Sequence, residues 1–246
     1  MKKFLYGIGS IISILALWQA LSLLGGYPRF ILPAPVEVLV RAQRLMSSGQ
    51  LLPHLSVTLA ESLAGFAVSA LLALILGYLA ASYRRFHLFV KPYILGLQAV
   101  PVLAVAPLLI IWFGSGFGTK VIIASLISFL PMFAADLQAF RSIGQVLRWD
   151  MQLLGATRWQ TFFKLELPAA APGILTGMKV GASLSLMGAV VGEFVGAQRG
   201  LGYLINLGKG LLDTPLVFTA IALLVILGLG LYAVMTGLEK LLLSLR

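Results

Sequence analysis

Long apolar segments alternate with short charged breaks along most of this chain. A helix needs about 20 mostly apolar residues to cross the hydrocarbon core of a bilayer, and six segments meet this requirement. We predict membrane-spanning helices at residues 4–24, 56–80, 92–113, 119–138, 170–193 and 214–237. The pattern therefore predicts an all-α polytopic membrane protein with six spans.

The basic residues indicate how these spans are oriented. Six spans place both termini on one side, and that side, with connections 81–91 and 139–169, holds eleven of the 18 Lys and Arg residues. The opposite connections hold six, and Lys179 falls inside the fifth span, where we expect it to extend toward the nearer interface. Because cytoplasmic loops are enriched in Lys and Arg, we predict that both termini and the 139–169 connection are cytoplasmic.

The first apolar run is interpreted as a membrane span, and the connection after it is interpreted as containing a helix at the outer interface. No charge appears from Phe4 to Pro28 and no A-x-A site follows, so we interpret the run as an uncleaved span. Pro33 and Pro35 predict a new helix near Val36, which would lie along the outer interface with Arg41 and Arg44 in water. The sequence shows no internal repeat, so we predict a single transmembrane domain, 1–246.

Composition agrees with a membrane location and excludes several functions. The chain is 60% hydrophobic and 11% charged, whereas a soluble domain has about a quarter charged residues. Its net charge of +10 comes from residues that flank apolar runs, so we attribute it to membrane orientation and predict no nucleic-acid partner. With no cysteine and two histidines, we predict no disulfide and no metal site.

No candidate for catalysis is found. The glycine-rich stretch from Gly114 to Lys120 lacks the G-K-[ST] of a phosphate-binding loop and is interpreted as a flexible hairpin. An intramembrane hydrolase would need a serine with a histidine, or paired aspartates, in mid-span. We therefore predict no catalytic residue and no ATPase activity in this chain.

The 139–169 connection is predicted to contain a short amphipathic helix. One face carries Trp159, Phe162 and Phe163, and the other carries Thr157, Thr161 and Lys164. Gly155 precedes this helix, and Pro168 is predicted to end it. A cytoplasmic helix with an aromatic face is suited to binding a soluble partner.

Small residues follow one side of the fifth span. Gly173, Gly177, Gly181, Ser185 and Ala189 recur every four positions, and Gly188 and Gly192 repeat this spacing one face over. Such residues allow close helix approach in lipid, so the stripe predicts helix packing, a pathway between two subunits, or both. We interpret Glu193 as a solvated carboxylate or as part of the outer mouth of a pathway, and for Asp136 and Glu61 the solvated interpretation is favoured more strongly.

Three stretches resemble the permease subunits of ABC importers in the nitrate/sulfonate/taurine group. They are Leu32-Pro33-Ala34-Pro35 with Glu37-Val38-Leu39, then Ala99-Val100-Pro101 through Ile111-Trp112-Phe113-Gly114, and finally Leu154-Gly155-Ala156 through Leu167-Pro168, Pro172 and Gly177, followed by Gly192-Glu193 and Gly200-Leu201-Gly202. The last stretch is similar to the "EAA" loop of these permeases, although Trp149-Asp150-Met151 stands where Glu-Ala-Ala is expected.

The resemblance implies a type I importer permease in the bacterial inner membrane, present as a homodimer. It implies two ATPase subunits, which bind ATP and Mg²⁺, and an extracytoplasmic solute-binding protein. ATPase coupling is then expected from Leu154, Gly155, Ala156, Thr157, Arg158, Trp159, Thr161, Lys164, Leu167 and Pro168. A pathway on the dimer axis is expected to be lined by Gly177, Gly181, Ser185, Gly188, Ala189, Gly192 and Glu193.

The identity of the substrate stays open, and so does one alternative class of transport protein. The related permeases handle small oxyanions and sulfonates, thiamine-precursor pyrimidines, or flavin-like molecules. The alternative is a stand-alone secondary transporter or channel, which usually keeps ionisable residues in mid-membrane. In this sequence only Lys179 is well inside a predicted span.

Overall fold

The computed structural model describes residues 2–26, 28 and 30–244, and all regular structure in these residues is helical. The helices are α1 (Lys2–Leu24), α2 (Pro35–Ser47), α3 (Leu51–Ser82), α4 (Arg84–Ala99), α5 (Val102–Phe113), α6 (Phe117–Arg141), α7 (Gln145–Leu153), α8 (Arg158–Thr161), the π-helical turn η1 (Phe162–Glu166), α9 (Leu167–Gly196), α10 (Leu201–Gly210) and α11 (Thr214–Ser244). The all-α prediction is confirmed.

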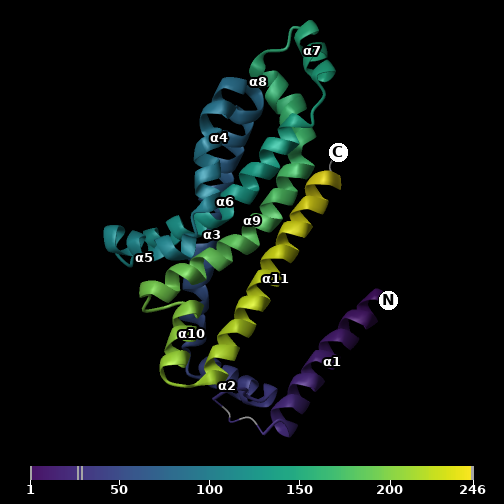
Figure 1. Ribbon diagram of the computed structural model, residues 1–246. Helices are drawn as coiled ribbons and strands as arrows, with labels where there is room; N and C mark the ends of the chain where they lie inside the picture. Colours follow the sequence, from purple (N-terminus) through teal and green to yellow (C-terminus); the bar gives the residue numbers. More distant parts are fainter. Residues whose placement is uncertain (1, 27, 29, 245–246) are drawn as a thin grey trace.

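The core of the molecule is a bundle in which α6 packs against both α3 and α9, with α11 beside α9 (Figure 1). Its buried centre includes Phe66 and Ala73 of α3, Met132 of α6, and Leu186 of α9. Glycine allows α3 and α6 to approach closely, because a Cβ atom built at Gly65 would lie 2.5 Å from the Cβ of Ala124. The bundle is therefore held together by interhelical packing of small residues, as expected in lipid.

Four helices are long and apolar enough to cross a membrane: α3, α6, the continuous helix Arg158–Gly196, and most of α11. The bent pair of α4 and α5 gives a fifth candidate. The segment Ser13–Leu24 of α1 is a shorter apolar helix. The number of six spans therefore stays a prediction.

The predicted third span, 92–113, is wrong as a single helix. It is divided into α4 and α5, which meet at an angle of 97° (Figure 1). The break falls at Val100, whose extended backbone (φ −84°, ψ 118°) precedes Pro101. A proline disfavours helical geometry in the residue before it, and this explains the break.

The predicted helix end at Pro168 is also wrong. Helix α9 follows η1 without interruption, so Pro168 lies in the first turn of a longer helix. In η1 the backbone N–H of Leu167 donates to the carbonyl oxygen of Phe162, one residue further back than in an α-helix. This wider turn accommodates the proline, which lacks an N–H group and would crowd the preceding α-helical turn.

The helix predicted near Val36 is confirmed as α2. Pro35 occupies its first turn, and the Glu37 carboxylate accepts a hydrogen bond from the N–H of Ala34 (3.1 Å). Arg41 is only partly exposed, at 29% of its side chain, because its guanidinium forms an ion pair with Asp213 at 2.8 Å. This pair ties α2 to the turn before α11, whereas Arg44 is exposed as predicted.

Candidate functional site

The connection between α6 and α9 forms a projection beyond the end of the bundle (Figure 1). The predicted helix start at Thr157 is confirmed. The Thr157 hydroxyl accepts from the N–H of Gln160, and the Gln160 side chain accepts from the N–H of Thr157 at 2.8 Å. Gly155 has a φ of +71°, a left-handed conformation that favours glycine. This turn sets the direction in which the chain enters α8.

The aromatic face of this segment is divided between the core and the surface. Phe162 points inward, with its ring 4.7 Å from that of Tyr78. Trp159 and Phe163 point outward, and their rings stack at 5.7 Å. The expectation that all three share one face is therefore wrong, because η1 changes the helical repeat between Trp159 and Phe163.

The projection presents an apolar surface to the outside. We call this the loop surface and define it by Leu153, Leu154, Trp159 and Phe163, whose exposed fractions are 86%, 81%, 74% and 56%. Among the other predicted coupling residues, Gly155, Thr157, Arg158 and Lys164 are exposed, and Ala156, Thr161, Leu167 and Pro168 are half-buried. Exposed apolar clusters of this kind mark interaction sites.

Three contacts fix the projection to the bundle. Arg148 of α7 donates to the Glu166 carboxylate at 2.7 Å and to the carbonyl oxygen of Phe140 at 2.9 Å. Arg158 of α8 donates to the hydroxyl of Tyr83 at 2.7 Å. A single sequence does not reveal these contacts, since they join residues that are up to 75 positions apart. They make the projection a continuation of the bundle, not a free loop.

The small-residue stripe of the fifth span packs against α6 of the same chain. A Cβ atom built at Gly188 would lie 2.5 Å from the Cα of Ala124, and one at Gly177 would lie 2.6 Å from the Cβ of Ala135. Gly181 similarly contacts Met132. Gly192 likewise contacts Lys120 of α6, and Ala189 is buried, whereas the buried Ser185 hydroxyl shares a hydrogen bond with Ser62 of α3 at 3.1 Å. Helix packing accounts for the stripe, and its role in a pathway stays a prediction.

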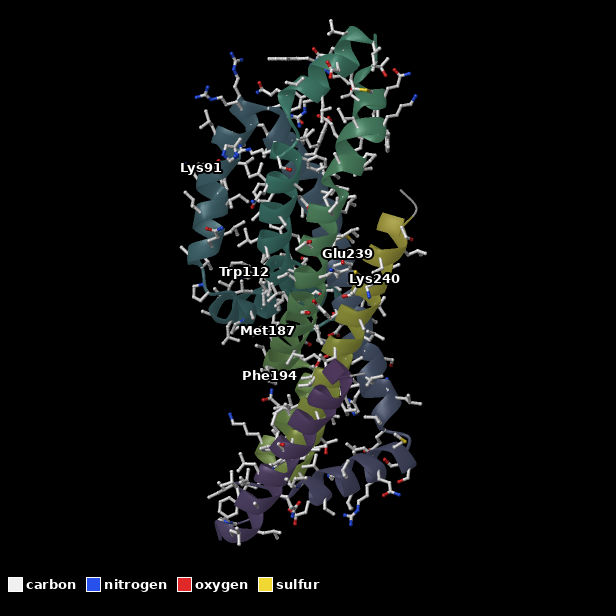
Figure 2. All side chains as sticks on the ribbon, turned by 90° about the vertical axis from the view of Figure 1, so that its right-hand side faces the viewer. Lys91, Trp112, Met187, Phe194, Glu239 and Lys240 are labelled. Atoms are coloured by element: carbon white, nitrogen blue, oxygen red, sulfur yellow. The ribbon has the colours of Figure 1, made fainter. Side chains whose placement is uncertain are left out.

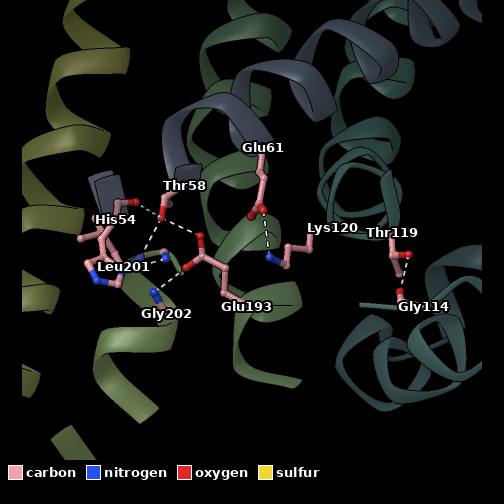
Figure 3. Close-up of polar contacts among 10 residues, drawn as sticks. His54, Thr58, Glu61, Gly114, Thr119, Lys120, Glu193, Leu201 and Gly202 are labelled. Atoms are coloured by element: carbon pink, nitrogen blue, oxygen red, sulfur yellow. Dashed lines mark hydrogen bonds and ion pairs between the residues drawn. The ribbon is translucent and has the colours of Figure 1, made fainter. Parts of the chain in front are cut away.

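Glu193 lies in a buried polar network where α3, α9 and α10 meet (Figure 3). Its carboxylate accepts from the Thr58 hydroxyl at 2.6 Å and from the N–H of Gly202 at 2.5 Å. Thr58 in turn accepts from the N–H of Leu201 at 2.8 Å. Glu193 and Thr58 therefore satisfy free N–H groups of the first turn of α10. The solvated interpretation of Glu193 is wrong, because the residue is 1% exposed.

The network explains the Gly200-Leu201-Gly202 sequence. Gly200 has a φ of +119°, and its N–H donates to Nδ1 of His54 at 3.1 Å. A Cβ atom at Gly202 would lie 2.8 Å from a carboxylate oxygen of Glu193. Glycine at both positions lets the backbone reach this carboxylate, which is the reason for the spacing.

Glu61 and Asp136 are also buried, which contradicts their solvated interpretation. Glu61 accepts from the Nζ of Lys120 at 3.0 Å, and the two side chains are 1% and 8% exposed. Asp136 is 2% exposed and packs against Gly77 of α3. Lys120, expected in a flexible hairpin, instead lies in the first turn of α6 (Figure 3). The sequence could not supply these partners, because they come from different helices.

Lys179 also has a partner. Its ammonium forms an ion pair with Glu239, near the end of α11, and its extension toward the interface stays a prediction. The pair joins α9 to α11 across their contact.

An apolar helical bundle with a rigid projection defines a polytopic membrane subunit, and comparison with known proteins specifies which kind. The chain belongs to the family described as "Binding-protein-dependent transport system inner membrane component", which matches residues 48–244. It is thus a multi-pass inner-membrane permease subunit of an ABC importer.

Curated relatives agree with this assignment. The chain is 44% identical over 229 residues to the riboflavin transport system permease protein RibX of Chloroflexus aurantiacus, covering 93% of this chain and 85% of that protein. It is 32% identical to the formylaminopyrimidine transport permease protein ThiX of Halalkalibacterium halodurans, covering 95% and 92%. It is 33% identical to a putative aliphatic sulfonates transport permease protein, SsuC of Bacillus subtilis, covering 87% and 78%.

The fold is also found in a solved structure. An inward-facing structure of the MetNI methionine ABC transporter matches with a TM-score of 0.65 and 18% identity, covering 77% of this chain and 93% of that chain. At this identity the likeness shows the fold alone, and it supports the type I permease fold predicted above.

Proposed function

We propose that two copies of this chain form the transmembrane pathway of the importer and that the loop surface binds its two ATPase subunits. The observation that carries this proposal is the exposed apolar loop surface on a projection fixed to the bundle by Arg148 and Arg158. ATP and Mg²⁺ are bound by the ATPases. A solute-binding protein delivers the substrate at the opposite end, and both termini face the cytoplasm.

The helix that follows the loop surface is suited to transmit movement. Arg158–Gly196 is a continuous helical segment of 39 residues, about 58 Å long at 1.5 Å per residue. Its far end holds Glu193, which caps α10. Since packed helices move as rigid elements, displacement of the loop surface by the ATPases would shift α9 and, through Glu193, the outer helix α10.

The pathway is proposed to follow α9. Its stripe of small residues allows close approach to α6. The other side of the helix exposes Val180, Ser183 and Met187, and Figure 2 labels Met187. This exposed side carries no charge at these positions, so it does not act as an anion filter of the kind that arginine clusters form. Selectivity then depends mainly on the binding protein.

The proposed substrate is a small organic solute. The names of the relatives include riboflavin, formylaminopyrimidine, aliphatic sulfonates and taurine. A flavin-like or pyrimidine vitamin, or a sulfonate, agrees with these names. Mass spectrometry of ligands retained by the cognate binding protein tests this part of the proposal, and a nucleic acid or peptide ligand would contradict it.

The importer function is tested by purification of the tagged chain from its native membrane. We expect an ABC ATPase to co-purify at one copy per permease chain, because each projection would hold one subunit. In proteoliposomes that contain the binding protein and its ligand, uptake should require ATP. Uptake without an ATPase, driven by an ion gradient, would support the secondary-transporter alternative instead.

Orientation is tested by cysteine labelling from each side of the membrane. Gln160 lies on the projection and Gln198 follows α9, and both residues are exposed. The two variants are Gln160→Cys and Gln198→Cys. With an impermeant thiol reagent, we expect the first to react only from the cytoplasm and the second only from outside. The cysteine-free parent chain provides the background, and the reverse pattern would contradict the proposed orientation.

A further inference from the structure

A groove separates α4 from α6 on the side of the molecule that carries Lys91 (Figure 2). It has a volume of about 380 Å³, within the range of roughly 300–1,000 Å³ that is typical of ligand sites. Three basic side chains line it, from His87, Lys91 and Arg141, together with apolar side chains that include Ile94, Phe133 and Leu137. No acidic residue is found among the lining residues in the described part of the chain.

The basic and apolar residues occupy different levels of the groove. Helix α4 begins at Arg84, near the projection, and runs toward the middle of the bundle, whereas α6 runs in the opposite direction and ends at Arg141 (Figure 1). His87 and Arg141 therefore share the end of the groove near the projection, and Lys91 lies one turn after His87 on α4. Ile94 and Phe133 lie further from the projection, where the other lining side chains include apolar Leu137.

We propose that this groove binds an anionic phospholipid of the cytoplasmic leaflet, with the headgroup phosphate between Lys91 and Arg141 and an acyl chain along Ile94 and Phe133. Lysine and arginine bind phosphate through charge-assisted hydrogen bonds. Basic pockets between transmembrane helices on the cytoplasmic side are suited to anionic headgroups. A free anion would use the basic end but would leave the apolar wall in water.

The surroundings of α4 favour a lipid as the occupant. Its other side exposes Leu88, Phe89 and Tyr93, with exposed fractions of 59%, 64% and 61%. Large apolar side chains at this level are suited to contact with acyl chains. Leu95, which lines the groove, is also 54% exposed, so the groove opens on its apolar side and a lipid can enter it from the bilayer.

The test uses the full-length chain, purified and then incubated with equimolar phosphatidylglycerol and phosphatidylcholine. Native mass spectrometry counts the lipids that each chain retains. We expect one tightly held phosphatidylglycerol per chain in the wild type. Each basic residue contributes about fivefold to binding an anionic lipid. The double variant Lys91→Gln with Arg141→Gln should therefore lower the preference of the chain for phosphatidylglycerol over phosphatidylcholine at least about tenfold.

The matched control is Arg84→Gln with Arg85→Gln. It removes the same charge from an exposed part of the same region, outside the groove. This control should retain phosphatidylglycerol like the wild type. Equal retention by the Lys91 and Arg141 variant, or equal loss in the control, would overturn the proposal.

Two further outcomes address other occupants. Displacement of phosphatidylglycerol by millimolar inorganic phosphate would show a free-anion site and overturn the lipid assignment. Efficient disulfide formation between two copies that carry Leu95→Cys would show that a second copy covers the groove, which would also overturn it. Neither depends on the importer function, so failure here is distinguishable from failure of that proposal.

Discussion

Replacement of Lys120 by methionine should destabilise the folded chain by about 3–5 kcal/mol, because the variant leaves the Glu61 carboxylate buried without its partner. The two side chains lie 3.0 Å apart and are 8% and 1% exposed. The measurement is the free energy of unfolding of the purified chain, by denaturant titration in mixed micelles. Lys209→Met, at an exposed lysine of α10, provides the matched control and should change stability little.

The double variant separates the loss of the partner from the loss of the lysine itself. Glu61→Gln with Lys120→Met removes both charges, so most of the lost stability should return, since a neutral pair avoids the cost of a buried charge. If Lys120→Met is as stable as Lys209→Met, the ion pair does not hold α3 to α6. If the double variant is no better than the single one, packing of the lysine stem explains the effect.

The sequence predicted the bundle well because its main signals are local. Each long apolar run is set by composition alone, and the close contact of α9 with α6 follows from glycine spacing in one helix. The helix start at Thr157 was also predictable, since a threonine cap acts within three residues. These features depend on neighbouring positions, which a single sequence displays.

Two proline positions show where local signals mislead. Pro101 was visible in the sequence, yet the surrounding apolar run favoured an unbroken span, and the chain turns by 97° there. Pro168 was expected to end a helix, but η1 adapts the hydrogen bonding before it and the helix continues. A proline alone does not determine whether a helix breaks. The turn that precedes it can change its hydrogen bonding so that the backbone N–H that proline lacks is not needed.

The polar partners could not be predicted from the sequence for a different reason. Glu193 and Thr58 are 135 positions apart, and Lys179 and Glu239 are 60 apart. Which acid meets which donor depends on how the helices rotate about their axes, and that rotation is set by packing across the whole bundle. The sequence therefore identified Glu193 as a candidate and did not assign its role as a cap of α10.

The coupling proposal predicts that Trp159→Ala weakens ATPase binding without unfolding the chain. Trp159 is 74% exposed and stacks on Phe163 at 5.7 Å, so its removal leaves the core intact. A buried tryptophan at the centre of an interface commonly contributes about 2 kcal/mol or more. We therefore expect the dissociation constant for the ATPase to rise roughly thirtyfold or more, and ATP-driven uptake to fall with it.

Trp112→Ala is the matched control, because Trp112 is 66% exposed but lies on α5, away from the projection (Figure 2). Phe162→Ala provides the opposite contrast. Its ring packs against Tyr78 and Phe140 inside the bundle, so this variant should lower the melting temperature as well as ATPase binding. Binding and melting temperature are measured on the same preparations. If Trp159→Ala binds the ATPase as tightly as Trp112→Ala and supports equal uptake, the loop surface does not couple this permease to its ATPase.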